Sequence, residues 1–287
     1  MRILVTNDDG IESEGIHVLA RSLAATEHEV LVVAPARDWS GAGAAIGTLH
    51  PDTHLDVRRA EIPGDPSIAA WALDGPPALC LVAGRLGAFG DAPDLVVSGI
   101  NAGANTGRSV LHSGTVGAAL AGQNFGISGL AVSVDVSPTW QWAAAAELAV
   151  ETLPLVVDAP RGSVLNLNVP ALPRDEIRGV RWVRLAPFGA VRATMTSSGD
   201  EVVQIELHPT DYDPPADTDQ GAIDRGWASL TALVGVAEAW PRPSDAVGDV
   251  DVELEVVPGA TLHEVHQVPD GNVGSVLVRP ALGDLAG

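Results

Sequence analysis

The sequence has one cysteine, few aromatic residues and no long apolar run. The shortage of cysteine and the lack of a long apolar run each exclude a class of protein. A single cysteine, Cys80, excludes an intramolecular disulfide and a zinc site built on cysteines. It stands in the apolar run ALCLVAG, which favours a small buried hydrophobic residue over a nucleophile. No uninterrupted apolar run reaches about 18 residues, and no apolar leader with a small-residue cleavage site is present. We therefore expect no membrane span and a soluble cytoplasmic protein.

Basic residues are also scarce. The chain has 37 Asp and Glu against 16 Lys and Arg, which gives a formal net charge of -21. Nucleic-acid grooves depend on clustered Lys and Arg, so the balance disfavours a nucleic-acid polymer as partner. A small phosphorylated substrate is compatible with this charge, because one divalent ion can neutralise it locally. The acidity itself is more simply explained by solubility in a salty or crowded cytosol.

Hydrophobic residues make up 46% of the 287 residues, which suffices for one large α/β domain or for a domain with an elaborated tail. The opening predicts a strand over 2–6, a helix over about 13–27 and a strand over 29–34, the start of a doubly wound α/β fold. Strands and helices then alternate up to about residue 170. Further helices are expected over 76–86, 114–123 and 140–157, and further strands over 94–98, 130–134 and 163–168. From Val180 onward the pattern changes to short strands and turns.

Two adjacent carboxylates follow the first predicted strand. Asp8 and Asp9 stand at its carboxyl end, which is the edge where open α/β sheets bind ligands. Neighbouring carboxylates repel each other, and their pKa values rise unless a cation joins them. Mg²⁺ suits such a pair, since it takes one or two carboxylates together with water and phosphate oxygens. The alternative is an Asp-Asp-Gly turn in which one Asp caps the following helix.

Neutral oxygen groups follow two more of the predicted strands. Ser40 comes after the strand over 29–34, and Asn101 comes after the strand over 94–98. Either could be an ordinary turn residue. Because the carboxyl ends of parallel strands meet at one edge, we expect both to lie beside Asp8 and Asp9 and to complete a site for a hard cation.

The stretch from Asn101 to Thr115 has the composition of a phosphate-binding loop. Gly or Asn occupies every second position from Asn101 to Gly107, and Ser113 opens a predicted helix. Free N–H groups and the positive end of the helix dipole suit a phosphate there. A tight loop and a plain N-cap at Ser113 are the alternative readings. The stretch is not a Walker loop, because no lysine follows the turn, and a Gly-x-Ser-x-Gly elbow is absent from the chain.

Taken together these motifs closely resemble the SurE family, the stationary-phase-survival phosphatases that act as 5′/3′-nucleotidases. The resemblance is carried by MRILVTNDDG at the start, AP…SGAG between residues 34 and 43, LDGPPALC over 73–80, and PDLVVSGINAGANTGRSVLHSGTVGAA over 93–119. Weaker matches are LAVS from residue 130, LNLNVP from residue 165 and the DTD…SLT stretch from residue 217. The resemblance covers about residues 1–235.

The resemblance implies a Rossmann-like, three-layer α/β/α core with a mostly parallel sheet. We expect this catalytic core over residues 1–180. A β-rich extension over residues 181–287, part of the same structural unit, would serve oligomerisation. Members of the family are usually dimers or tetramers that exchange C-terminal segments, so a homodimer or homotetramer is expected.

The resemblance also implies a metal-dependent phosphomonoesterase that hydrolyses nucleoside 5′- or 3′-monophosphates. One Mg²⁺ or Mn²⁺ per subunit would be held by Asp8, Asp9, Ser40 and Asn101. The phosphate would be bound by Asn105, Ser113, Gly114 and Thr115. The residues implied in catalysis are Asp8, Asp9, Asn105 and Ser113. The attacking group is either a metal-activated water molecule or the Asp8 carboxylate.

The chain departs from the family pattern at a few positions. Leu79 stands where an acidic residue is common, Ala121 replaces a Glu, and Ala44 and Ala45 replace polar residues. No proposed metal ligand is affected. The departures leave open a phosphatase for a non-nucleotide biosynthetic ester, and a nucleotide-binding module without catalysis is a second alternative.

Overall fold

The structure is a computed structural model that describes residues 1–187, 191–198, 203–209, 212–237, 239–241, 254–256, 265–266 and 277–278. By its backbone contacts the chain divides into two units, Met1–Leu233 and Val234–Gly287. The first unit carries every predicted site residue.

One nine-stranded sheet runs through the first unit, in the order β3-β4-β2-β1-β5-β6-β7-β11-β8. Its six inner strands, β4 to β7 in that order, are all parallel to their neighbours. They are β4 (Ala69–Leu73), β2 (Glu29–Pro35), β1 (Arg2–Thr6), β5 (Leu95–Ala102), β6 (Ser128–Val134) and β7 (Val164–Val169). At the two edges, β3 (Val57–Ala60) and β11 (Ala228–Leu233) pair antiparallel with β4 and β7, and β8 (Val180–Trp182) joins β11.

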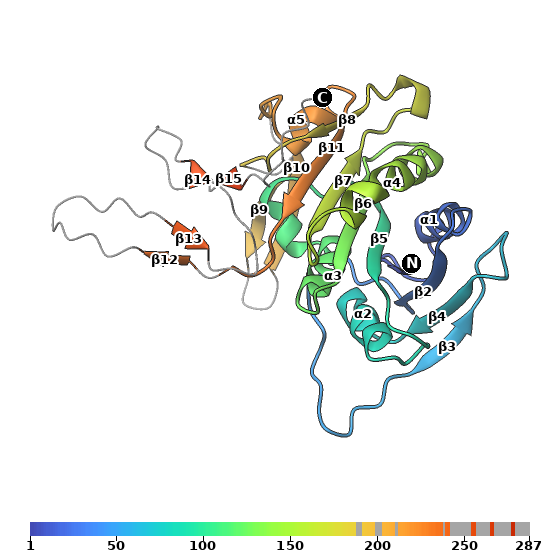
Figure 1. The fold of residues 1–287 in the computed structure, drawn as a ribbon. Coiled ribbons are helices and arrows are strands. Elements are labelled where there is room, and N and C mark those ends of the chain that lie inside the picture. Colours follow the sequence, from blue (N-terminus) through green and yellow to red (C-terminus); the bar gives the residue numbers. More distant parts are fainter. Residues whose placement is uncertain are drawn as a thin grey trace. The chain divides into compact units, whose positions relative to one another are not determined.

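Helices cover both faces of this sheet (Figure 1). Helices α1 (Glu14–Ala24) and α4 (Trp142–Val157) pack on one face, and α2 (Pro77–Arg85) and α3 (Gly114–Gln123) on the other. The side chains of β1 show why, because successive residues of a strand point to opposite faces. Ile3 joins the apolar cluster under α1 and α4, whereas Leu4 joins the cluster under α2. This confirms the predicted α/β fold class and its three layers.

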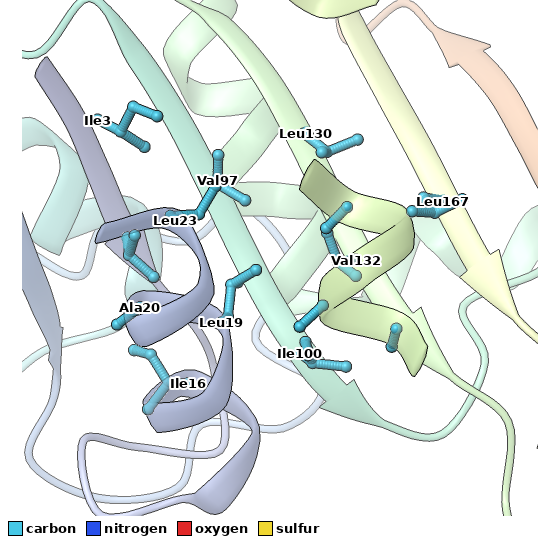
Figure 2. Close-up of a cluster of buried hydrophobic side chains, with 14 of the residues drawn as sticks. Ile3, Ile16, Leu19, Ala20, Leu23, Val97, Ile100, Leu130, Val132 and Leu167 are labelled. Carbon is cyan, nitrogen blue, oxygen red and sulfur yellow. The ribbon is translucent and has the colours of Figure 1, made fainter. Parts of the chain in front are cut away.

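The core under α1 illustrates how the sequence pattern becomes packing (Figure 2). Ile16, Leu19, Ala20 and Leu23 recur at helical spacing and are all fully buried. They meet the apolar side chains of the inner strands, Ile3, Val97, Ile100, Leu130, Val132 and Leu167. The strands are apolar on both faces because both faces are covered, as is usual for a parallel sheet.

The predicted change of pattern after Val180 is present. Strands β9 (Val191–Ser198) and β10 (Val203–Pro209) form an antiparallel pair of their own, and the short helix α5 (Asp219–Ile223) precedes β11. The large sheet thus takes strands from both sides of residue 180. The assignment of residues 1–180 as catalytic core and 181–287 as an oligomerisation extension stays a prediction.

The second unit contains two short antiparallel pairs within its described residues. They are β12 (Ala239–Pro241) with β13 (Leu254–Val256), and β14 (Val265–His266) with β15 (Leu277–Val278). Most of the predicted β-rich end of the chain lies outside the described residues. Among the helices that the structure describes, none has the length and apolarity needed to cross a membrane. The cytoplasmic location stays a prediction.

Candidate active site

The turn after β1 is built by Asn7, a residue that the sequence analysis did not assign. Its fully buried side chain donates from Nδ2 to the Gly10 carbonyl (3.0 Å) and to Ser13 Oγ (2.7 Å), and its Oδ1 accepts from the Gly10 amide (3.2 Å). Gly10 has a φ of +98°, which favours glycine. The turn thereby closes on itself and presents Asp8 and Asp9 at the carboxyl end of the central strand.

Asp8 is held by the start of α3. Its Oδ2 accepts from the Gly114 amide at 2.9 Å, and its Oδ1 accepts from Thr115 Oγ1. Burial raises the pKa of this carboxyl, while the hydrogen bonds from Thr115 and Gly114 oppose the rise. A Cβ added at Gly114 would lie 2.7 Å from the Asp8 Cβ, so only glycine allows this approach. The N-terminus of α3 therefore fixes the Asp8 carboxylate.

Asp9 lies on the other side of the turn, close to the end of β5. Burial, followed by repulsion from Asp8 and Asp38, raises its pKa to about 6, and a hydrogen bond from the Ala102 amide partly opposes the rise. Asp38 was not predicted as part of the site. It brings a third carboxylate close enough to affect Asp9, which increases the need for a cation.

Three chain segments thus converge on the Asp8–Asp9 pair. The Trp39 amide donates to the Asp8 carbonyl at 2.8 Å, which places the loop after β2 against the turn. The end of β5 contacts Asp9 through Ala102, and α3 contacts Asp8 through Gly114.

Ser40 and Asn101, whose neutral oxygens were predicted as metal ligands, lie in two of these segments. Ser40 is exposed, and its Oγ donates to Asp38 Oδ1 at 2.7 Å. Asn101 lies within β5 rather than after it, and its Nδ2 donates to the Gly103 carbonyl at 2.6 Å. Both groups use a donor in these bonds, so the Ser40 Oγ lone pairs and the Asn101 Oδ1 remain acceptors that a cation could use.

The donor chemistry at this edge fits a hard divalent cation. Among the described residues, no arginine or histidine forms an ion pair with Asp8 or Asp9, and burial raises the pKa of both carboxyls. In the same part of the chain, no three His, Cys, Asp or Glu side chains gather in a metal-holding group. A cation here would therefore depend on neutral oxygens such as those of Ser40 and Asn101.

Ser113 caps α3. Its side chain is buried, and its Oγ accepts from the Val116 amide at 3.1 Å. The Gly114 and Thr115 amides face the Asp8 carboxylate, so the positive end of this helix already meets a negative group. The N-cap reading of Ser113 is confirmed, and the phosphate-binding role of residues 113–115 stays a prediction.

The loop that carries Asn105 is anchored from the C-terminal part of the first unit. The buried Asp219 carboxylate accepts from the amides of Gly107 (2.7 Å), Ala186 (2.8 Å) and Gln220 (2.8 Å), and Gln220 Oε1 accepts from Thr106 Oγ1 (2.6 Å). Burial raises the pKa of Asp219, and the three amide donors oppose the rise. The DTD stretch therefore has a structural role, because its Asp219 anchors the Asn105 loop, and the spacing of the motif alone does not reveal this role.

An open cleft of about 480 Å³ adjoins Ser40. The Arg37 guanidinium lies over the Trp39 ring, 4.8 Å from its centroid. The cleft is lined by Arg37, Asp38, Trp39, Ser40, Gly41, Ala42 and Ala45. Its lining comes from the loop after β2 alone, and that loop contacts Asp8 through the Trp39 amide.

The structure separates the departures from the family pattern. Leu79 and Ala121 are buried in the apolar cluster under α2, so they concern the core. Ala45 lines the cleft, and Ala44 is exposed beside it. Cys80 is fully buried in the same cluster as Leu79, which confirms its reading as a small hydrophobic residue, and burial raises the pKa of its thiol.

Comparison with known proteins adds to this geometry. The family described as "Survival protein SurE" matches residues 3–189. The chain is 39% identical over 237 residues to the 5′/3′-nucleotidase SurE of Erwinia tasmaniensis, with 81% of this chain and 90% of that protein covered. It is 44% identical over 191 residues to the 5′-nucleotidase SurE of Gloeobacter violaceus, with 64% of this chain and 70% of that protein covered. The solved SurE protein of Aquifex aeolicus superposes with a TM-score of 0.68 at 30% identity and covers 82% of this chain and 93% of its own.

Proposed function

This chain belongs to the SurE family, and on that premise we propose that it is a divalent-metal-dependent phosphatase that acts on nucleoside 5′- and 3′-monophosphates. It is a phosphoric monoester hydrolase, and the names of its relatives support nucleotidase activity. The metal requirement and the role of each residue are our proposal.

The observation that carries the proposal is the pair of poorly compensated carboxylates at the end of β1. Asp8 and Asp9 are adjacent and desolvated, Asp9 is also repelled by Asp38, and the pKa values of both carboxyls are raised. Such an arrangement costs free energy unless a cation is bound. Oxygen ligands at the carboxyl edge of a parallel sheet suit Mg²⁺ or Mn²⁺.

Each side chain then has a defined task. Asp8 and Asp9 would hold the cation, with Ser40 and Asn101 as neutral ligands. When bound, the cation would polarise the phosphate and neutralise charge at the site. Thr115 and Gly114 keep Asp8 in one orientation through the contacts described above.

The substrate phosphate would meet the segment that follows. The Asn105 amide would donate to a phosphate oxygen, and Ser113, Gly114 and Thr115 would line the phosphate on the side of α3. Hydrogen-bond donors placed where negative charge develops are the largest contributors to such reactions. The attacking group is a water molecule or the Asp8 carboxylate.

The test is phosphate release from a panel of monophosphates with Mg²⁺, Mn²⁺ or a chelator. We expect release from nucleoside 5′- and 3′-monophosphates that requires the metal. Full activity in excess chelator would contradict the metal dependence. Binding of a nucleoside monophosphate in calorimetry without phosphate release over hours would instead indicate a nucleotide-binding module.

A second candidate function is a phosphatase for a non-nucleotide ester. It is favoured by Ala45, which lines the cleft where relatives commonly carry a polar residue. A smaller and less polar cleft wall would change which leaving group fits. Rates on sugar phosphates and other small phosphates above those on nucleoside monophosphates would establish this alternative.

We also propose a homodimer or homotetramer in which C-terminal segments are exchanged. The family resemblance supports it, as does the division of the chain into a large unit and a separate C-terminal unit. Light scattering of the full chain would give a mass of two or four times 29.5 kDa. A monomeric mass would contradict the assembly.

A further inference from the structure

A row of buried polar side chains crosses three neighbouring strands beneath the Asn105 loop. Asn168 of β7 lies opposite Ser133 of β6 and opposite Ser229 of β11, and Asn166 of β7 lies opposite Thr231 of β11. All five residues are buried, four of them completely. Burying polar groups in a sheet that is otherwise apolar is costly unless they form hydrogen bonds. Among the described residues the hydroxyls of Ser229 and Thr231 have no hydrogen-bond partner, whereas the other three residues of the row all bind Asn105.

Asn166 and Asn168 use their amides to hold the backbone of Asn105. Asn168 Oδ1 accepts from the Asn105 amide N–H at 2.7 Å, and Asn168 Nδ2 donates to the Asn105 carbonyl at 3.0 Å. Asn166 Nδ2 donates to the same carbonyl at 2.9 Å. One side chain thus satisfies both main-chain polar groups of Asn105, in the manner of a neighbouring strand.

The side chain of Asn105 is oriented by the same row. Its Nδ2 donates to Ser133 Oγ at 2.9 Å. An amide has two N–H donors, so Ser133 takes one and leaves the other free to point elsewhere. Because the backbone is fixed by Asn168 and the amide by Ser133, the remaining N–H has one direction.

The described partners of Asn105 lie outside its own loop. Residues 104–106 belong to neither a helix nor a strand, and the two residues after Asn105 are bound by α5, Thr106 through Gln220 and Gly107 through Asp219. The bonds to Asn105 come from positions 28, 61 and 63 residues away in sequence. The loop position of Asn105 is therefore imposed by β6 and β7.

We propose that Asn168, assisted by Asn166, is a positioning residue that holds the Asn105 amide in place to donate to the substrate phosphate. This rests on the proposed function of Asn105. It assigns a role to the LNLNVP motif, which the sequence analysis noted without one. Donors in an active site must be held within a fraction of an ångström, and a displacement of about 1 Å can cost about 10²-fold in rate.

The geometry predicts a ranking of variants. Asn168→Ala removes two of the three hydrogen bonds to the Asn105 backbone, including the one from its N–H, so kcat on an aryl phosphate should fall about 10-fold to 10²-fold. Asn166→Ala should have a smaller effect, because Asn168 still donates to the same carbonyl. Thr231→Val is the matched control. Thr231 lies in the same buried row, its hydroxyl has no hydrogen-bond partner in the described part of the chain, and valine has its shape, so kcat should be unchanged.

The test is a double-mutant cycle on Asn105 and Asn168, because a residue that acts through another does not add to its loss. Two quantities are measured with Mg²⁺ present: kcat on p-nitrophenyl phosphate, and the Kd of orthophosphate by calorimetry. We expect the double alanine variant to be within about twofold of Asn105→Ala alone in both. Losses that multiply in the double variant, or an Asn168→Ala protein with unchanged kcat and Kd, would overturn the proposal.

The two readouts distinguish this proposal from the proposed function. If the wild type binds orthophosphate but hydrolyses no ester, the proposed function fails and the Kd cycle alone decides the positioning role. If the wild type neither binds orthophosphate nor hydrolyses an ester, both are wrong. Should Asn168→Ala not fold, Asn168→Asp replaces it, since it keeps the size and the acceptor but removes the donor to the Asn105 carbonyl.

Discussion

The two loops that carry most of the site are held in opposite ways. The turn from Asn7 to Gly10 is closed by bonds that span at most six residues, all made by Asn7. The loop around Asn105 is held by partners between 28 and 114 residues away. The shape of the first loop therefore depends mainly on Asn7, although Trp39 and the start of α3 also bind Asp8, whereas the second loop depends on β6, β7 and α5. A loop held by bonds within its own sequence can be predicted from a motif. A loop held by partners far along the chain cannot.

The largest effect should come from residues that are proposed to hold the cation. Asp8→Asn and Asn101→Ala should each lower kcat on an aryl phosphate by about 10²-fold or more, because each removes a ligand of the proposed cation. Asp91→Asn is the control, since Asp91 is exposed before the opposite end of β5. Full activity in Asp8→Asn would remove the basis for treating the turn after β1 as the catalytic centre.

The loop held from a distance is tested at Asp219. Asp219→Asn keeps the size of the side chain but sets an amide donor against a backbone N–H, so kcat should fall about 10-fold and the free energy of unfolding by about 1–3 kcal/mol. Denaturant unfolding and steady-state kinetics measure the two quantities.

Asp217→Asn is the matched control for this anchor. Asp217 forms an exposed ion pair with Arg184, whose hydrogen bond lowers the pKa of the Asp217 carboxyl. Exposed pairs are worth about 0–1 kcal/mol, so stability should change little and kcat not at all. Equal effects of the two substitutions would mean that the anchor at Asp219 has no special role.

The smallest effect is a pH dependence of the first loop. The folded pKa of Asp9 is raised from 3.8 to about 6, so between these values the folded state binds more protons than the unfolded state. The stability of the metal-free protein should therefore fall as pH rises through this window. Unfolding in chelator from pH 4 to 7 measures it, and Asp9→Asn should flatten the slope. The raised pKa would be contradicted if the stability of the wild type rose over this range and Asp9→Asn showed the same slope of stability against pH.

The same contrast explains how much could be predicted from the sequence. Apolar runs such as RILVT and EVLVVA indicated the inner strands, and the order of strands and helices indicated the layers, because both depend on local patterns. Asp8 and Asp9 were predicted as site residues for the same reason, because they closely follow such a run. Asp38 and the capping of Asp8 by α3 were not, since they depend on which segments meet in space.

Asn168 and Asp219 show the limit most clearly. Each lies in a motif that was noticed, but the partner of each is far along the chain, and nothing in LNLNVP or DTD names Asn105 or Gly107. Among the departures from the family pattern, Leu79 and Ala45 are of the same kind in sequence, because each is an apolar residue in place of a polar or acidic one. Only the packing separates a core position from a cleft position.

The central claim is that Asp8 and Asp9 together hold one divalent cation. Calorimetric titration of Mn²⁺ into the wild type and into Asp8→Asn/Asp9→Asn tests it most directly, because the readout does not depend on the substrate. If Asp8 and Asp9 hold the cation, one Mn²⁺ should bind per subunit of the wild type, and none should bind to the double variant at the same concentrations. Equal binding by both proteins would contradict it.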